Sequence, residues 1–308
     1  MRKAGRFMSV LITLVACASP VLSAMPYAGG ATKLEPARVQ SAGGAGAAIG
    51  GDSSLVWLNP GILATCKDKS LVLGAQRGTA TDLSGQILWT SPLAGGFLST
   101  GFDYYHAGNM EFYLPDGSSR TINLQRDLVI SAGWGTKLFG NIGGGLNVKG
   151  MRSELVTDTG SWAASADLGL HLQFGDMVSG GVSFQNLGSP VKWGTDSMSQ
   201  PALVRMGLAA TMPVRENIMG DPADYLVLLQ DVSWSFMDSA FVSSTGAEYQ
   251  WNNAAFLRAG IRVGSPSELS AYSVGAGIRT TAYRLDYAAW LGSPIEMPHF
   301  LTLTFFIR

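Results

Sequence analysis

Apolar residues alternate with small or polar ones in about fourteen segments of the chain, which Gly, Pro, Asn and Asp separate. A period of two places successive side chains on opposite faces of a β-strand. Each segment has about the length of a tilted membrane strand, about 9–11 residues, and an even count is typical of a bacterial single-chain barrel. The pattern predicts strands near residues 69–78, 84–92, 95–106, 126–138, 141–152, 160–174, 177–187, 201–213, 223–236, 240–251, 254–264, 270–280, 283–291 and 299–307.

The polar faces of these segments carry the charge. In residues 254–264, Arg258 and Arg262 share one face, and in residues 162–174, Asp167 and His171 do. Because an Arg at the lipid midplane costs roughly 2–4 kcal/mol, the charged faces are predicted to look into the lumen of a barrel. The predicted lumen charge network consists of Asp167, Arg205, Glu248, Arg258, Arg262, Arg279, Arg284 and Asp286.

Composition favours a membrane barrel over a soluble β-sandwich or propeller, the alternative for the same alternation. Apolar residues make up 46% of the 308 residues and charged residues only 14%, against roughly 25% charged in an average soluble domain. No fixed repeat of propeller length occurs. Aromatic residues near the predicted strand ends are expected to form girdles at the membrane interfaces: Trp89, Tyr104, Trp134, Trp162, Trp234, Tyr249, Trp251, Tyr283, Tyr287 and Trp290.

The first 24 residues resemble an export signal, with Arg2, Lys3 and Arg6 before the apolar run 7–18. Two forms of processing are open: cleavage after Ser23 or Ala24, or lipidation at Cys17 within a lipobox-like sequence. Either form leaves Cys66 without a disulfide partner. After the signal no run reaches the ~18–20 apolar residues of a transmembrane helix. An exported, apolar chain without such helices is expected in a bacterial outer membrane as a barrel.

Residues 25–66 lack strand alternation and are predicted to form helix and loop that pack inside or beneath the barrel of residues 67–308. Asp52 is a candidate N-cap for one or two helical turns through Leu58, and Pro60 ends the pattern or opens the next turn. The predicted fold is therefore a single antiparallel all-β transmembrane barrel of about fourteen strands with a short helical N-terminal plug segment.

Nothing in the sequence has the pattern of a catalytic or metal site. The three histidines, His106, His171 and His299, have no nucleophile and acid nearby, and Asp167 lies roughly 13 Å from His171 along the strand. Neither ligand spacing nor a phosphate-binding loop is present, because the glycine runs 143–145 and 180–181 fall inside strands. The net charge of -1 provides no positive electrostatic potential that would attract nucleic acid. We expect a protein without enzymatic activity, cofactor or metal.

Several stretches together resemble the PorV/PorQ-type outer-membrane proteins, which belong to the FadL-like barrels. The stretches are Gly51 to Gly61, Phe184 to Gly188, Gln200 to Gly207, Gly246 to Tyr249, Phe256 to Gly260, Gly275 to Gly277, Leu285 to Ala288 and His299 to Leu303. The resemblance implies a fourteen-stranded barrel with a plugged lumen, in which Asp52, Asn59 and Pro60 belong to the plug motif. Gly61 stands where the family usually has Ala, and the chain ends in Arg308 rather than an aromatic residue.

The resemblance also implies two functions. The favoured one is a shuttle for exported cargo proteins among the components of type IX-like secretion, working through loops such as 108–125 and 191–200. The alternative is a FadL-like passive transporter of hydrophobic small molecules, with Trp57, Leu58, Ile62 and Leu63 lining an apolar pocket or else packing the plug against the wall. An apolar cavity at the plug favours transport, whereas a lumen blocked by charge pairs beneath ordered loops favours protein handling.

Overall fold

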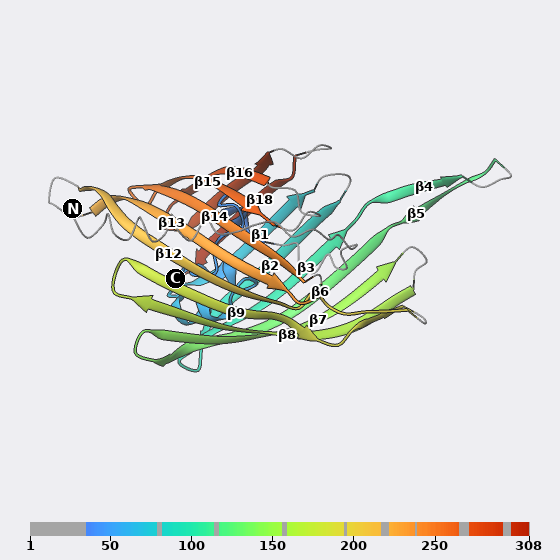
Figure 1. The fold of residues 1–308 in the computed structure, drawn as a ribbon, viewed down its shortest axis with the longest axis horizontal. Coiled ribbons are helices and arrows are strands. Elements are labelled where there is room, and N and C mark those ends of the chain that lie inside the picture. Colours follow the sequence, from blue (N-terminus) through green and yellow to red (C-terminus); the bar gives the residue numbers. More distant parts are fainter. Residues whose placement is uncertain are drawn as a thin grey trace.

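Fourteen antiparallel strands close into one barrel in the computed structural model of the protein, as Figure 1 shows. The structure describes residues 35–78, 82–113, 117–155, 159–193, 196–216, 222–237, 239–264, 271–291 and 297–307. The export signal, with Cys17, Ser23 and Ala24, lies outside these residues. The predicted fold class is confirmed, because β1 pairs with β18 and leaves no open edge.

The strand boundaries agree with the predicted segments to within three residues. The barrel strands are β1 (Lys69–Arg77), β2 (Leu83–Leu93), β3 (Gly96–His106), β6 (Gln125–Phe139), β7 (Ile142–Leu155), β8 (Thr159–Phe174), β9 (Val178–Gly188), β12 (Leu203–Glu216), β13 (Pro222–Ser235), β14 (Ala240–Trp251), β15 (Ala255–Val263), β16 (Ala271–Arg279), β17 (Tyr283–Leu291) and β18 (His299–Ile307). Two small sheets add β4 (Asn109–Tyr113) with β5 (Ser119–Asn123), and β10 (Val191–Trp193) with β11 (Asp196–Met198).

The two rims of the barrel differ. One rim has tight turns with left-handed residues, such as Ala94 and Gly95 at φ 50° and 74°, and Asn252 and Asn253 at φ 48° and 53°. The other rim carries the two small sheets, and the β4–β5 hairpin projects well beyond the barrel in Figure 1. In outer-membrane barrels the short turns face the periplasm and the longer connections face outward.

Residues 35–66, here called the plug, fold inside the barrel as α2 (Ala37–Gln40) and the 3-10 helices η2 (Ser53–Leu55) and η3 (Pro60–Thr65). Asp52 caps η2 by accepting from the Ser54 N–H, and Asn59 caps η3 by accepting from the Gly61 N–H. Pro60 opens η3, where its missing N–H costs nothing. The described helices include none that is long and apolar enough to cross a bilayer.

Apolar and polar residues alternate along the strands, so the barrel has an apolar outer face and a polar lumen. The predicted aromatic residues are exposed on the outside, with the exception of Trp290. The prediction for Trp290 is wrong: it shares the lumen face of β17 with Arg284 and Asp286, and its indole N–H donates to the Gln40 carbonyl at 3.1 Å. A plug beside the wall can satisfy this N–H, and sequence alternation alone does not reveal the plug.

Candidate functional site

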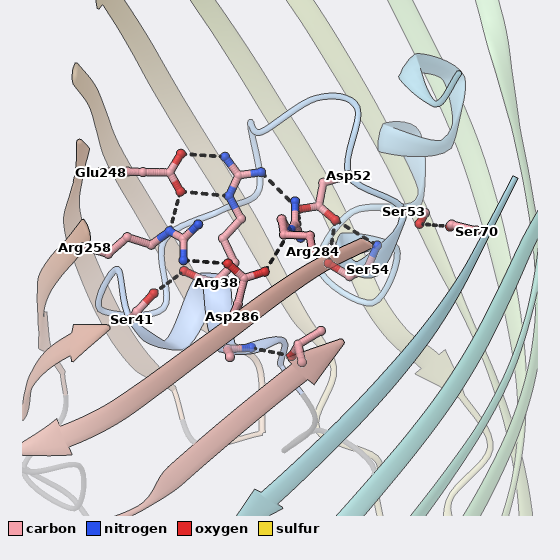
Figure 2. A network of polar contacts seen from close by, with 12 residues as sticks. Arg38, Ser41, Asp52, Ser53, Ser54, Ser70, Glu248, Arg258, Arg284 and Asp286 are labelled. Carbon is pink, nitrogen blue, oxygen red and sulfur yellow. Dashed lines mark hydrogen bonds and ion pairs between the residues drawn. The ribbon is translucent and has the colours of Figure 1, made fainter. Parts of the chain in front are cut away.

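Six charged side chains form a closed ring between the plug and the wall, as Figure 2 shows. Arg38 pairs with Asp52 at 3.0 Å and with Glu248 at 2.7 Å, and Arg284 pairs with Asp52 and with Asp286, both at 2.6 Å. Arg258 closes the ring by pairing with Glu248 and, at 2.8 Å, with Asp286. Three guanidinium groups and three carboxylates alternate, so the ring is neutral and each charge has two partners of opposite sign.

Strand register brings the wall members of this ring together. Glu248 on β14 lies directly opposite Arg258 on β15, and Asp286 on β17 lies opposite Gly277 on β16. Arg258 reaches Asp286 across Gly277, because a Cβ there would lie 3.1 Å from Nη1 of Arg258 and 2.3 Å from Oδ1 of Asp286. The glycine therefore makes room for an ion pair that spans three strands.

The plug members of the ring stay ionised. Burial opposes the charge on Asp52, but the Arg284 and Arg38 guanidinium groups outweigh it and hold the pKa of this carboxyl well below its usual range. Burial likewise works against the charge on Arg38, and Glu248 and Asp52 outweigh it and raise the pKa of this guanidinium. Since breaking such a buried pair leaves a charge uncompensated, the ring fixes the plug to β14 and β17.

A second balanced cluster anchors the start of the plug. Glu35 pairs with Arg205 at 2.8 Å and with Arg262 at 3.1 Å. Asp231 accepts from the backbone N–H groups of Gly46 and Ala47, each at 3.0 Å, and lies 3.8 Å from Arg205. Burial opposes ionisation of Glu35, yet the two arginines hold its pKa below the usual range.

The Asn-Pro turn of the plug is fixed against β7 and β8. The Asn59 side chain is fully buried and donates to the carbonyls of Ala47 and Leu170, at 2.8 and 2.9 Å. Gly145 and Gly169 face this turn, where an added Cβ would lie 2.1 Å from the Pro60 oxygen and 2.1 Å from Oδ1 of Asn59. The mid-strand glycines therefore provide close packing between plug and wall.

Two of the predicted network residues lie apart from both clusters. Asp167 pairs with Lys149 at 2.7 Å and accepts from the backbone N–H of Asn186, where β9 bulges. Within the described residues Arg279 joins no ion pair, and its guanidinium lies 4.8 Å from the ring centre of Phe306. The structure thus divides the eight predicted residues among a ring, a second cluster, a separate pair and a cation–π contact.

The four plug residues considered for an apolar pocket are packed to different extents. Leu58 and Ile62 belong to the apolar core that joins the plug to β12 and β13, and Leu63 belongs to the one beside β1 and β2; all three are at most 1% exposed. Trp57 is only partly buried and touches a third apolar cluster higher in the lumen. Trp57 therefore joins the apolar core beside β1 and β2 to this third cluster.

This third cluster is an apolar patch on a polar wall. Val129 on β6, Met151 on β7 and Ala163 on β8 are direct cross-strand neighbours, and Val191 of β10 packs on them. The neighbouring backbone N–H of Lys192 donates to the Ser161 hydroxyl at 3.0 Å. In the connection 191–200, predicted as an extracellular working surface, Val191 is 4% exposed and packs into the lumen, so this residue is not part of an exposed surface.

Sequence reasoning missed Arg38, Glu35, Asp231 and Lys149. Arg38 and Glu35 are isolated charges in a segment rich in small residues, a signal that could have marked them as partners of the inward-facing wall charges. No group of three His, Cys, Asp or Glu residues suited to a metal ion occurs in the described parts of the chain. His171 is engaged with the Ala48 carbonyl at 3.0 Å.

Solved structures with the same fold exist. The toluene transporter TbuX of Ralstonia pickettii is similar at a TM-score of 0.65 and 12% identity, over 90% of this chain and 100% of that one. The toluene transporter TodX of Pseudomonas putida gives 0.66 and 11%, over 88% and 98%. A FadL homologue of Pseudomonas aeruginosa gives 0.53 and 10%, over 88% and 98%. No family model matches the sequence, and no curated protein does.

The chain therefore has the same fold as these transporters and the FadL homologue. This agrees with the broader part of the resemblance seen in the sequence. The similar structures give no support to its narrower PorV/PorQ part or to a role in type IX-like secretion, since they are described as transporters and channels for toluene and monoaromatic hydrocarbons.

Proposed function

We propose that this protein is a passive channel that admits hydrophobic small molecules across the outer membrane. The observation that carries the proposal is the apolar patch of Val129, Met151 and Ala163 directly above Trp57 of the plug. An apolar surface inside a polar lumen is suited to binding a hydrophobic solute. The likeness to two toluene transporters over about nine tenths of the chain supports the same solute class.

The plug is anchored unevenly, which suggests a route past it. In the described part of the chain, hydrogen bonds and ion pairs tie the plug to β8, β9 and β12–β18, and Ser53 contacts Ser70 of β1 at 2.6 Å. Strands β2, β3, β6 and β7 meet it through apolar and glycine packing. The glycines of β6 and β7 let the wall touch the plug backbone closely, so a solute would pass on the β2–β3 side, where apolar side-chain packing joins plug and wall.

The β10–β11 hairpin covers this route. Val191 packs onto the apolar patch, and the Lys192 N–H holds the hairpin to β8. A solute that reaches Trp57 from outside must therefore displace Val191. Loops that fold over a site in this way are common gates.

A reversible crosslink tests the gate. We would introduce Val191→Cys and Ala163→Cys into a Cys66→Ser background and measure toluene uptake by cells of a host strain without such channels. The disulfide should reduce uptake to the level of the host alone, and reduction should restore it. The two single-cysteine variants are the controls.

Two outcomes would contradict the proposal. If cells with the unmodified protein in the membrane take up toluene no faster than the host alone, the proposed channel function is wrong. Equal uptake in the oxidised and reduced double variant, with the crosslink shown by a mobility shift, would remove the gate.

A second candidate is the handling of exported proteins. One observation favours it: the charge clusters block one side of the lumen while the β4–β5 hairpin projects beyond the rim. Isolation of the protein from envelope fractions in mild detergent separates the two candidates. Exported proteins or attachment factors in stoichiometric amount would favour the second, and bound hydrophobic molecules would favour the channel.

A further inference from the structure

Four buried polar atoms around the apolar patch have no hydrogen-bond partner. They are both carboxylate oxygens of Asp103, Nε2 of Gln86 and Nε1 of Trp57. Asp103 and Gln86 are each 4% exposed. Buried polar groups in native proteins are nearly always hydrogen-bonded, so a cluster without partners needs an explanation.

These atoms lie in one place. Gln86 on β2 is the direct neighbour of Asp103 on β3, and Asp103 is the direct neighbour of Val129 on β6. The same row continues through Met151 and Ala163, so its first half is polar and its second half is apolar. The row turns toward the lumen throughout.

Trp57 lies just below the polar half of this row. Its Cζ2 atom is 3.0 Å from the position that a Cβ on Gly101 would take, and Gly101 is two residues from Asp103 on the lumen face of β3. Cζ2 is on the edge of the indole next to Nε1. The unpartnered indole N–H therefore belongs to the same neighbourhood as the carboxylate and the amide.

The neighbouring side chains do not supply hydrogen-bond partners for all of these polar atoms. Lys149, one row below on β7, is engaged with Asp167 at 2.7 Å and with the Asn186 side chain. The Gln86 amide already lies within hydrogen-bonding reach of Asp103, and this contact still leaves one carboxyl oxygen and the Trp57 N–H unpaired. Leaving a buried carboxylate without a donor is costly.

We infer that this row, in the channel proposed above, binds a hydrophobic molecule that carries a hydroxyl group, such as a phenol or an alcohol. A hydroxyl donates to the Asp103 oxygen that Gln86 does not reach and accepts from the Trp57 N–H, while the apolar body rests on Val129 and Met151. A bare hydrocarbon satisfies none of the polar atoms, and an ammonium leaves the Trp57 N–H donor unpaired. Val191 moves aside when the ligand enters.

Toluene and p-cresol differ by one hydroxyl and form a matched pair of probes. Calorimetric titration of the full chain in detergent, with a micelle blank, should give p-cresol an affinity at least about tenfold higher than that of toluene, the effect of two neutral hydrogen bonds. Asp103→Leu should reduce p-cresol to the affinity of toluene and leave toluene binding unchanged or tighter.

Asp127→Asn is the matched control. Asp127 lies one row above and has its own partners in Ser153, at 2.5 Å, and Gln125, at 2.8 Å, so this variant should keep the preference for p-cresol. If Asp103→Leu does not fold, Trp57→Phe removes the unpaired indole N–H and must weaken the preference.

The possible failures are distinguishable. Equal binding of toluene and p-cresol, or an unchanged preference in Asp103→Leu, would overturn the hydroxyl site and leave the channel intact. Binding of neither molecule would overturn the proposed function as well.

Discussion

Replacing Arg258 by Leu tests the ion-pair ring between plug and wall. The Arg258 side chain is 1% exposed and lies between two carboxylates that are equally buried. Its loss turns a neutral ring of six into a buried group with one excess negative charge. Removing one partner of a buried pair costs about 3–5 kcal/mol, and here the cost should be about 3 kcal/mol because Glu248 keeps Arg38 and Asp286 keeps Arg284.

The measurement is the free energy of unfolding in urea, followed by tryptophan fluorescence of the barrel refolded into lipid vesicles. Arg152→Leu is the control, because its pair with Glu154 is exposed, at 47% and 28%, and should contribute below about 1 kcal/mol. Adding Glu248→Gln to Arg258→Leu restores neutrality, so the double variant should be more stable than the single one. Equal stabilities of Arg258→Leu and the native protein, or a double variant that is less stable than the single, would refute the balanced ring.

Three further predictions concern the plug. Gly145→Ala should destabilise the protein by about 1–3 kcal/mol in the same urea assay, because its Cβ would meet the Pro60 oxygen at 2.1 Å, whereas Gly150→Ala on the same strand, with open space around it, should have little effect; equal losses would speak against close packing. Asp52 has a lowered folded pKa, so the stability it contributes is present above the ordinary carboxyl pKa near 4 and is lost on further acidification; unfolding free energy should stay level from about pH 7 to 5 and fall below about pH 4, and a rise there would contradict the ion pairs. Burial raises the pKa of the Cys66 thiol to about 12, so maleimide at pH 8 should label the folded protein far more slowly than the unfolded one, and rapid labelling would show that the plug leaves the lumen.

The strand pattern was enough to predict the barrel. Alternation between lipid and lumen has a period of two that no plug contact disturbs, and the inward direction of Arg258 and Arg262 followed from the cost of a charge in lipid. Asp52 also occupies the N-cap position, and Pro60 the first helical position, that local rules assign to them.

The partners of the inward charges could not be read from the strands. Arg38 and Glu35 meet wall residues that are more than 160 positions away in the chain, and only closure of the barrel brings them together. Arg279 points into the lumen as predicted, but its guanidinium stacks on Phe306. Its direct neighbour in the strand register is Arg284, so no carboxylate lies opposite it. Whether a charged side chain points into the lumen is therefore a local property of its strand. Which ion pair it forms depends on the strand register and on the path of the plug.

The order of charges around the ring decides how the plug can move. Arg38 and Asp52 are adjacent in the ring and both belong to the plug, so the ring joins plug and wall through two links, Arg38 to Glu248 and Asp52 to Arg284. Breaking one link leaves the other in place, and release of the plug requires both to break at once in a buried setting. A solute of modest affinity cannot supply that free energy. In the proposed channel, passage therefore depends on movement where the plug is held by packing alone, beside Trp57 and under the β10–β11 hairpin, while the ring side keeps the plug in register.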